Sequence, residues 1–341
     1  MRRLRPLPAL LGLLLAVLPV GASACGGSAP ATGGAGTARS GAPPEKIRVG
    51  VIPIPDSALV YLARDRGYFA AEGLEVEPVV VRGGGPAIEK MRGGALEFAL
   101  INYVTGFLYQ RREPGQLKLV ADAYHAAPGA FQLFVPPGSP IRNVRDLKTP
   151  GGPKRSIAVA TLRSVATLSA ETVLAAAGLS AADVAFKEIP LPDMPAALAA
   201  HTVDVAWMTE PFITAYARQG GRSLGDAMAN VPAGWPIAGW ATTSSYAGAH
   251  PRSVAGFQRA MAHAQLDSRD RALVTGVLGT YTKIPREVLP TITLGTFPAG
   301  LEAEKLQAVV DTMVRFGYLP APLRAESMIV RPPWESGKGN P

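Results

Sequence analysis

The amino-acid sequence predicts an α/β fold built from two similar lobes, and two observations support this. Short apolar strands alternate with helices between residues 46 and 124, and the same alternation returns between residues 156 and 211. Strands separated by helices pair in parallel with right-handed crossovers, so each block predicts a sheet that has helices on its faces. In such sheets a ligand lies beyond the carboxyl ends of the strands.

The first block contains four predicted strands. Residues 46–54, KIRVGVIPI, are rich in valine and isoleucine and end at prolines, which is typical of a strand. A helix is predicted next, because Asp56 or Ser57 is a natural N-cap and apolar residues follow at helical spacing. The other predicted strands are 74–81, 96–102 and 117–124, and a short helix is predicted in GPAIEKMRGG, residues 85–94.

The second block repeats this order, with strands predicted at 156–160, 184–190 and 203–211. Within it, TVDVAWMTEPFITAYA resembles ALEFALINYVTGFLYQ of the first block: each has an acidic residue, a short apolar strand and an aromatic-bearing helix. Coincidence in a composition rich in alanine and valine is the alternative. If the lobes are similar, their third strands deliver Asn102 and Tyr103, and Thr209 and Glu210, to one cleft.

After Trp235 the chain changes character, since an extended segment and several helices follow. A return crossing followed by terminal helices makes the second lobe an insertion in the first. The predicted boundaries are 46–132 with 237–330 for lobe 1, 133–236 for lobe 2 and 331–341 for a C-terminal tail.

The first 25 residues predict an export signal. Arginines precede an apolar stretch, and small residues lead to Cys25, the only cysteine of the 341-residue chain. The segment resembles a bacterial lipobox, in which the cysteine becomes the lipidated N-terminus, although Ala22 stands where leucine is usual. Ordinary secretory cleavage nearby is the alternative. Prolines interrupt the short apolar stretch, which argues against a membrane-spanning helix.

Residues 26–45 consist mostly of glycine, serine, threonine, alanine and proline, so they predict a flexible linker. Together with a lipid on Cys25, they predict a protein anchored to the cell membrane on its extracytoplasmic face.

Charge and motifs exclude several other classes of function. The formal net charge is +8, of which three charges lie in the predicted signal, and the basic residues are too scattered to predict nucleic-acid binding. The four histidines do not cluster at metal-ligand spacing and are predicted to be exposed. Since there is no catalytic motif either, we predict no metal, no cofactor and no enzymatic activity.

Four segments resemble the solute-binding proteins of ABC importers. They are GYFAAEGLEVEPVVVRGGG, GGALEFALIN, SPIRNVRDLKT and VAWMTEPFITAYARQG. The closest group is the nitrate, sulfonate, taurine (NitT/TauT-type) and pyrimidine-precursor binding family, and the resemblance covers roughly residues 46–320. It implies a bilobal, type II periplasmic-binding-protein-like fold, in which two doubly wound α/β sheets are joined by a two-strand hinge. The crossings are expected near Phe131–Val135 and Pro236–Ala241.

This resemblance implies a monomeric lipoprotein that binds a small organic or inorganic anion between its lobes and delivers it to an ABC permease. The cysteine-rich ligand motif of the pyrimidine-precursor binders is absent, so that chemistry is not transferred. The alternatives are an enzyme of the pyrimidine-precursor synthase type on the same fold, and a ligand sensor for a membrane receptor.

The candidate ligand contacts lie at the predicted joints. Gly84 and its neighbouring glycines permit close backbone approach at a helix start, although a flexible turn is the alternative. Thr161, Arg163 and Ser164 precede a long helix, where hydroxyl and N–H groups suit an oxyanion; an N-cap beside a solvated arginine is the alternative.

Several candidate side chains keep two interpretations. Trp207 is a stacking wall for the ligand or part of the core. Glu210 accepts a hydrogen bond from an amine or caps the helix that begins at Pro211. Tyr103 and Tyr124 form the opposite wall or pack in the interior. Arg82, Arg163 and the helix starts favour an anion, whereas the aromatic residues favour a planar or amine-bearing ligand. The full set is Asp56, Ser57, Gly84, Asn102, Tyr103, Tyr124, Thr161, Arg163, Ser164, Trp207 and Glu210.

Overall fold

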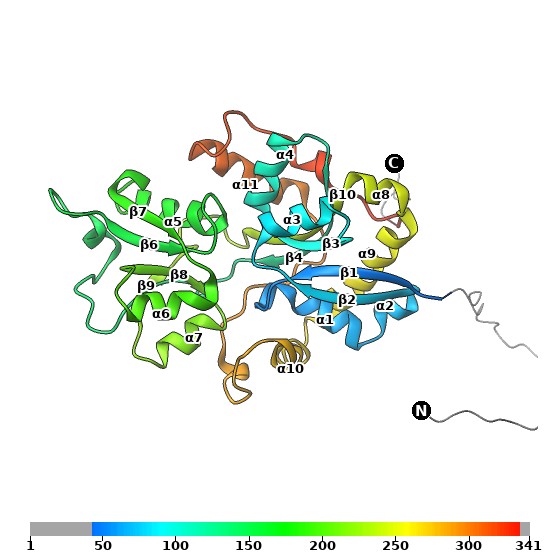
Figure 1. The fold of residues 1–341 in the computed structure, drawn as a ribbon, viewed down its shortest axis with the longest axis horizontal. Coiled ribbons are helices and arrows are strands. Elements are labelled where there is room, and N and C mark those ends of the chain that lie inside the picture. Colours follow the sequence, from blue (N-terminus) through cyan, green and yellow to red (C-terminus); the bar gives the residue numbers. More distant parts are fainter. Residues whose placement is uncertain (1–42, 335–341) are drawn as a thin grey trace, which may run out of the picture. The chain divides into compact units, whose positions relative to one another are not determined.

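The computed structural model describes residues 43–334, in which helices surround two five-stranded sheets (Figure 1). We call the first sheet with its helices lobe 1 and the second lobe 2. Lobe 1 contains β1 (Glu45–Val51), α1 (Ala58–Asp65), α2 (Tyr68–Ala71), β2 (Leu74–Val80), α3 (Gly84–Arg92), β3 (Phe98–Asn102), α4 (Tyr103–Arg112), β4 (Leu117–His125), β10 (Pro236–Thr243), α8 (Ser244–Ala249), α9 (Pro251–Asp267), α10 (Arg271–Tyr281) and α11 (Ala303–Arg315). Lobe 2 contains β5 (Phe131–Val135), β6 (Arg155–Val159), α5 (Val165–Ala176), β7 (Val184–Glu188), α6 (Met194–Ala199), β8 (Val205–Thr209), α7 (Phe212–Ala217) and β9 (Arg222–Asp226).

The two sheets have the same topology. Their strand orders are β2-β1-β3-β10-β4 and β7-β6-β8-β5-β9. In each sheet the first three strands pair in parallel, and the fourth position is held by a strand that is antiparallel to both its neighbours. Figure 1 shows α5 on one face of the lobe 2 sheet, and α6 and α7 on the other. The predicted bilobal, doubly wound α/β fold is confirmed.

The two matching segments of the sequence occupy equivalent places in these sheets. The carboxylate of Glu97 accepts hydrogen bonds from the backbone N–H of Arg48 at 2.6 Å and from the Arg48 side chain, which ties the start of β3 to β1. In lobe 2 the carboxylate of Asp204 accepts from the backbone N–H of Ser156 and from Arg155 Nη1, both at 2.8 Å. The acidic residue of each segment therefore joins a third strand to the first strand of its sheet.

The chain passes between the sheets twice, through residues 126–130 and residues 227–235. The crossings were predicted near residues 131–135 and 236–241. These residues instead belong to β5 and β10, which are strands of the two sheets, so the connections lie just before them. Phe131 and Gln132, which the prediction assigned to lobe 1, pair with β8 and β9 of lobe 2. Pro236, assigned to lobe 2, pairs with β4 of lobe 1.

A large aromatic core supports the lobe 1 sheet. Phe98 of β3 stacks on Phe257 of α9 with ring centroids 4.2 Å apart, and Trp240 of β10 meets the same ring edge-on. A separate, smaller core in lobe 2 contains Met208 of β8 and Leu198 of α6. Each sheet thus has apolar support that positions its strand ends.

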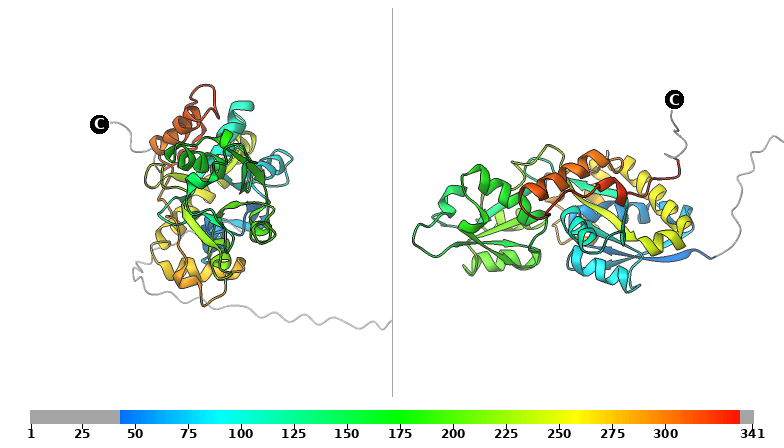
Figure 2. Two further views of the ribbon diagram at one scale, coloured as in Figure 1. Left: turned by 90° about the vertical axis from the view of Figure 1, so that its left-hand side faces the viewer. Right: turned by 90° about the horizontal axis from the view of Figure 1, so that it is seen from above.

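A side-chain contact also links the end of lobe 1 to lobe 2. Figure 2 shows α11, in orange, on the side of lobe 1 near lobe 2. Tyr318 follows α11; its carbonyl accepts a hydrogen bond from Arg163 Nη2 at 2.9 Å, and its ring lies 4.6 Å from the Arg163 guanidinium. This contact connects the C-terminal part of the chain to the segment before α5.

The predicted signal peptide, Cys25 and most of the predicted linker lie outside the described residues, as do residues 335–341. Within residues 43–334, no helix combines the length and the apolar composition that crossing a membrane requires.

Gly239 of β10 offers a test of the lobe 1 packing. A Cβ atom there would lie 2.3 Å from Oη of Tyr103, a ring that is buried and cannot move aside. We expect Gly239→Ala to lower the free energy of unfolding by about 1–3 kcal/mol, measured by urea denaturation. Gly276→Ala in α10 is the matched control, because nothing lies within 4 Å of its added methyl group. Equal effects of the two substitutions would contradict this packing.

Candidate functional site

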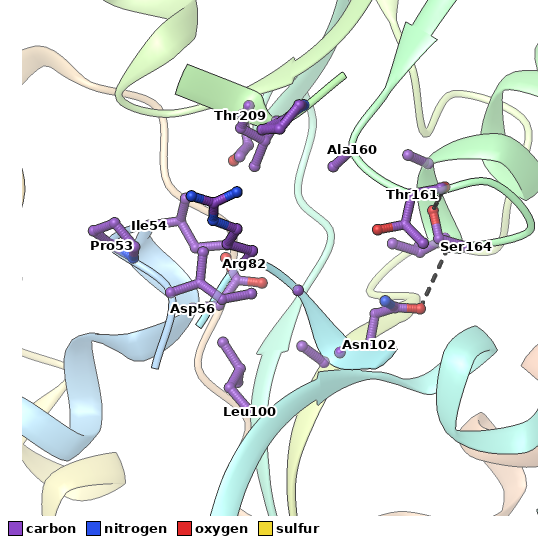
Figure 3. A pocket seen from close by; sticks show the side chains of 18 of the residues that line it. Pro53, Ile54, Asp56, Arg82, Leu100, Asn102, Ala160, Thr161, Ser164 and Thr209 are labelled. Atoms are coloured by element: carbon purple, nitrogen blue, oxygen red, sulfur yellow. Dashed lines mark hydrogen bonds between the residues drawn. The ribbon is translucent and has the colours of Figure 1, made fainter. Parts of the chain in front are cut away.

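A cavity of about 370 Å³ opens where strand ends of the two lobes meet (Figure 3). From lobe 1 it is lined by Ile52–Ile54, which directly follow β1, and by Asn102 at the end of β3. From lobe 2 it is lined by Ala160 and Thr161 after β6, and by Thr209 at the end of β8. The cavity therefore lies at the carboxyl ends of both sheets, where α/β sheets bind ligands.

Most of the cavity wall is apolar. Trp207 of β8 contributes to it and stacks on Phe131 of β5, with ring centroids 5.0 Å apart. The Trp207 indole Nε1 donates a hydrogen bond to Ser169 Oγ at 2.9 Å, so the ring is held in place from behind. Trp207 is buried in lobe 2 and also lines the cavity, and its stacking on a ligand stays a prediction. An apolar wall with a few polar groups is typical of a site for an organic molecule.

Three helices begin at the cavity. The Asn102 Oδ1 atom caps α4 by accepting from the backbone N–H of Thr105 at 2.9 Å. The residue that precedes α3 or α5 does not cap it, because Gly83 has no side chain and the Ser164 hydroxyl donates to the carbonyl of Thr161 at 2.6 Å. Uncapped helix starts present N–H groups and a partial positive charge, so they attract an anionic group.

Close contact between the lobes occurs at these helix starts. Asn102 Oδ1 also accepts a 3.4 Å hydrogen bond from the backbone N–H of Val165, which begins α5 in lobe 2. Gly83 has a φ of 155°, and a Cβ atom there would lie 3.4 Å from the Thr161 hydroxyl of lobe 2. The positive φ favours glycine at this position, and a side chain there would make an ordinary van der Waals contact with lobe 2.

Asp56 is the buried acidic group of the cavity. Its side chain is almost fully buried, and its Oδ2 atom has no hydrogen-bond partner among residues 43–334. Burial raises the pKa of this carboxyl to about 7, because the charged form loses its hydration. Arg82 also lines the cavity but is exposed and forms no ion pair with the described residues. Figure 3 shows Asp56 and Arg82 across the cavity from Asn102, Thr161 and Ser164.

Six of the predicted ligand contacts line this cavity, and their contact with a ligand stays a prediction. They are Asp56, Gly84, Asn102, Thr161, Ser164 and Trp207.

Three predicted residues of lobe 1 lie elsewhere. The Ser57 hydroxyl accepts a hydrogen bond from the backbone N–H of Ile52 and so holds the turn after β1. The Tyr103 ring packs in the interior, and its hydroxyl donates to Asp122 Oδ1 at 2.7 Å. The Tyr124 hydroxyl accepts from the backbone N–H of Gly295. Of the two interpretations of these tyrosines, packing in the interior is the one that the structure shows, because both rings are buried.

Two predicted residues of lobe 2 also lie outside the cavity lining. Arg163 is held by Tyr318, as described above, and does not face the cavity. The Glu210 carboxylate accepts from the backbone N–H of Thr214 at 3.1 Å and from its hydroxyl at 2.7 Å. Of the two interpretations of Glu210, helix capping is the one that the structure shows.

One histidine prediction is also wrong. His125 is buried, and its Nε2 lies 2.8 Å from Asp122 Oδ2. This pair and Tyr103 form a polar network inside lobe 1, beside the connection 126–130. No group of three potential metal ligands occurs in the described part of the chain.

Apart from Trp207, the sequence did not predict the apolar part of the wall. Phe131, Leu100 and Ile237 lie on central strands, and a segment around Leu191 follows β7. The sequence places these residues in or after predicted strands, which could have indicated a ligand site. Apolar residues at such positions are equally typical of a core, so they were not predicted.

The raised pKa of Asp56 predicts how stability depends on pH. Between pH 3.8, its ordinary value, and about 7, the folded protein keeps a proton that the unfolded chain has lost. The free energy of unfolding should therefore fall as pH rises through this window, by on the order of 4 kcal/mol. Asp56→Asn should remove this fall, seen as a difference between urea unfolding series at pH 4.5 and 7.5. Parallel pH profiles of the two proteins would contradict the burial of an unpaired carboxyl.

Comparisons with known proteins agree with this architecture. Residues 40–272 match the model of the NMT1-like family. The alkanesulfonate-binding protein SsuA from Xanthomonas axonopodis pv. citri, bound to MOPS, is 22% identical; the match covers 85% of this chain and 99% of SsuA, with a TM-score of 0.69. The nitrate-binding protein NrtA from Synechocystis PCC 6803 is 16% identical over 86% and 88% of the two chains, with a TM-score of 0.70.

An enzyme also has this fold: the desulfurization enzyme DSZB is 16% identical over 86% of this chain and 98% of its own, with a TM-score of 0.61. No curated protein matches the chain. The solved structures show the fold, and the match over residues 40–272 shows the family. The chain belongs to the NMT1-like family.

Proposed function

We propose that this chain is the solute-binding component of an ABC importer. The observation that carries the proposal is the cavity to which both lobes contribute, beside the two connections 126–130 and 227–235. A ligand that contacts both lobes stabilises the arrangement in which they meet, and a permease distinguishes that arrangement from the open one. The similar fold of SsuA and NrtA supports the same role.

We infer that the solute is a small organic molecule with an acidic group. A cavity of about 370 Å³ falls at the lower end of the range for organic ligands, and an inorganic anion would leave most of it unfilled. The uncapped starts of α3 and α5 suit the acidic group, whereas Trp207 and Phe131 suit an apolar body.

A binding role fits the cavity better than catalysis. Its described lining includes hydroxyl groups on Thr161, Ser164 and Thr209, but no histidine, lysine or cysteine. The Ser164 hydroxyl is engaged with the carbonyl of Thr161, so it is not activated by a neighbouring base. Incubation with the solute should therefore leave the solute mass unchanged in a mass spectrum.

The direct test of this function is native mass spectrometry of the full chain extracted from membranes in mild detergent. We expect one co-purified small molecule per chain, and we expect uptake of that molecule to fall when the gene is deleted. Retention of uptake after deletion would favour the sensor alternative, and a chain that never carries a solute would contradict the proposal.

Trp207→Ala tests the apolar wall. Loss of the indole removes a stacking surface and the partner of Ser169, so affinity for the co-purified molecule should fall about tenfold or more. Trp207→Phe keeps a ring and should retain more of the affinity, while calorimetry separates binding from loss of folding. Unchanged affinity in Trp207→Ala would place the residue in the core alone.

We also propose that Cys25 is lipidated and that the protein is a monomer held at the extracytoplasmic face. Cys25→Ser should move the chain from the membrane fraction to the soluble extracytoplasmic fraction. The readout is fractionation with metabolic labelling by a radioactive fatty acid. Equal labelling and equal membrane association of both chains would exclude the anchor.

A further inference from the structure

The unpartnered carboxyl oxygen of Asp56 requires an explanation. Asp56 is 3% exposed, lines the cavity and leaves Oδ2 without a hydrogen-bond partner among the described residues. A buried carboxylate without a hydrogen-bond partner is destabilising, because it has lost its hydration and gained no replacement. Such a group persists where the protein gains a function from it.

The groups that surround Asp56 do not satisfy it. Tyr124 of β4 and Tyr281 of α10 lie near enough to interact electrostatically with it. The Tyr281 hydroxyl donates to the carbonyl of Ile54 at 3.0 Å, and the Tyr124 hydroxyl accepts from the backbone N–H of Gly295. Neither hydroxyl is a hydrogen-bond partner of Asp56 Oδ2.

The charged groups nearby do not satisfy it either. Arg82, after β2, is the cation of the cavity lining and forms no ion pair with Asp56. Arg271 of α10 donates to the carbonyl of Ile292, and the Glu210 carboxylate after β8 accepts from Thr214, so neither is a partner of Asp56. Within residues 43–334, Asp56 Oδ2 thus has no hydrogen-bond partner, and Asp56 is one of the residues that line the cavity.

We propose that Asp56 is the subsite for a basic nitrogen of the ligand, a protonated amine or amidine. The inference rests on the proposed function and deepens it, because it makes the solute a zwitterion. Figure 3 shows the separation that this requires: Asp56 is on one side, and Asn102, Thr161 and Ser164 are on the other. The acidic group of the solute binds at the helix starts, its apolar body lies along Trp207, and its nitrogen donates to Asp56.

This arrangement links binding to proton release. Burial holds the Asp56 carboxyl partly protonated near pH 7 in the empty cavity, and a bound cation stabilises the carboxylate. Below pH 7 each bound cation displaces a proton, so affinity for an amine-bearing solute rises with pH, by up to about tenfold per pH unit. If instead the acidic group of the solute accepts a hydrogen bond from the protonated Asp56 carboxyl, the affinity falls as pH rises.

Two matched pairs of probes test the proposal. One pair is 4-(aminomethyl)benzenesulfonate and 4-methylbenzenesulfonate, and the other is taurine and ethanesulfonate. Calorimetry on the full chain, freed of co-purified solute, measures their affinities at pH 5.5, 6.5 and 7.5. We expect the amine member of at least one pair to bind tenfold tighter than its partner at pH 7.5, and its affinity to rise with pH.

Asp56→Asn keeps the shape of the side chain and should abolish this preference. The matched control is Asp65→Asn at the end of α1, which removes the same charge from an exposed position outside the cavity lining and should leave the preference within about twofold. If Asp56→Asn does not fold, the protein without the substitution still tests the proposal, because its affinity for the amine probe must rise with pH.

Four outcomes would overturn the inference: no amine preference in either pair, including no binding at all; a preference that survives Asp56→Asn; equal loss in Asp65→Asn; or an affinity for the amine that falls with pH. If one of these outcomes occurs but native mass spectrometry detects a co-purified solute, the proposed solute-binding function is still supported. Failure of the amine subsite and failure of solute binding are therefore distinguishable.

Discussion

Each sheet contains one strand, β10 or β5, that pairs antiparallel to both its neighbours, and the positions of these two strands constrain the rest of the structure. β10 enters the lobe 1 sheet between β3 and β4, and β5 enters the lobe 2 sheet between β8 and β9. Each of these strands receives the chain directly after it has passed from the other lobe. Both also line the cavity, through Ile237 and Ala238 on β10 and Phe131 on β5. A change in either connection therefore moves a wall of the cavity directly, which couples ligand contact to the relative position of the lobes.

The chemistry of the cavity is divided between its two sides. Uncapped helix starts lie on one side and the buried carboxyl of Asp56 on the other, with aromatic and aliphatic walls between them. Apolar contact supplies affinity with little selectivity, whereas a few fixed polar groups select the ligand. The empty protein is destabilised by the unpaired carboxyl, and a ligand that offers a donor there relieves that cost. The unpaired carboxyl of Asp56 thus lowers the free energy of unfolding of the ligand-free protein, and it does so at the position that selects the ligand.

The sequence predicted the alternating strands and helices of each block and the likeness of the two blocks, because both depend on local periodicity. It also named Asp56, Gly84, Asn102, Thr161 and Ser164, which follow or end predicted strands, and Trp207, which lies within one; all six line the cavity. Tyr103 and Tyr124 could not be assigned in this way, because Gly239 and Gly295, distant in the sequence, leave the space that their rings fill. The contact of Arg163 could not be predicted either, since its partner Tyr318 lies 155 residues away in the sequence. The missing partner of Asp56 is a property of the folded chain alone.

The central claim is that a solute bound between the lobes draws them together, and a distance between the lobes tests it most directly. Cys25 is the only cysteine, so a Cys25→Ser chain accepts two spin labels, through Lys90→Cys on α3 and Ala175→Cys on α5. Both positions are exposed and outside the cavity lining. Pulsed electron paramagnetic resonance should show a shorter and narrower distance distribution when the co-purified solute is restored. The same distribution with and without bound solute would contradict the account.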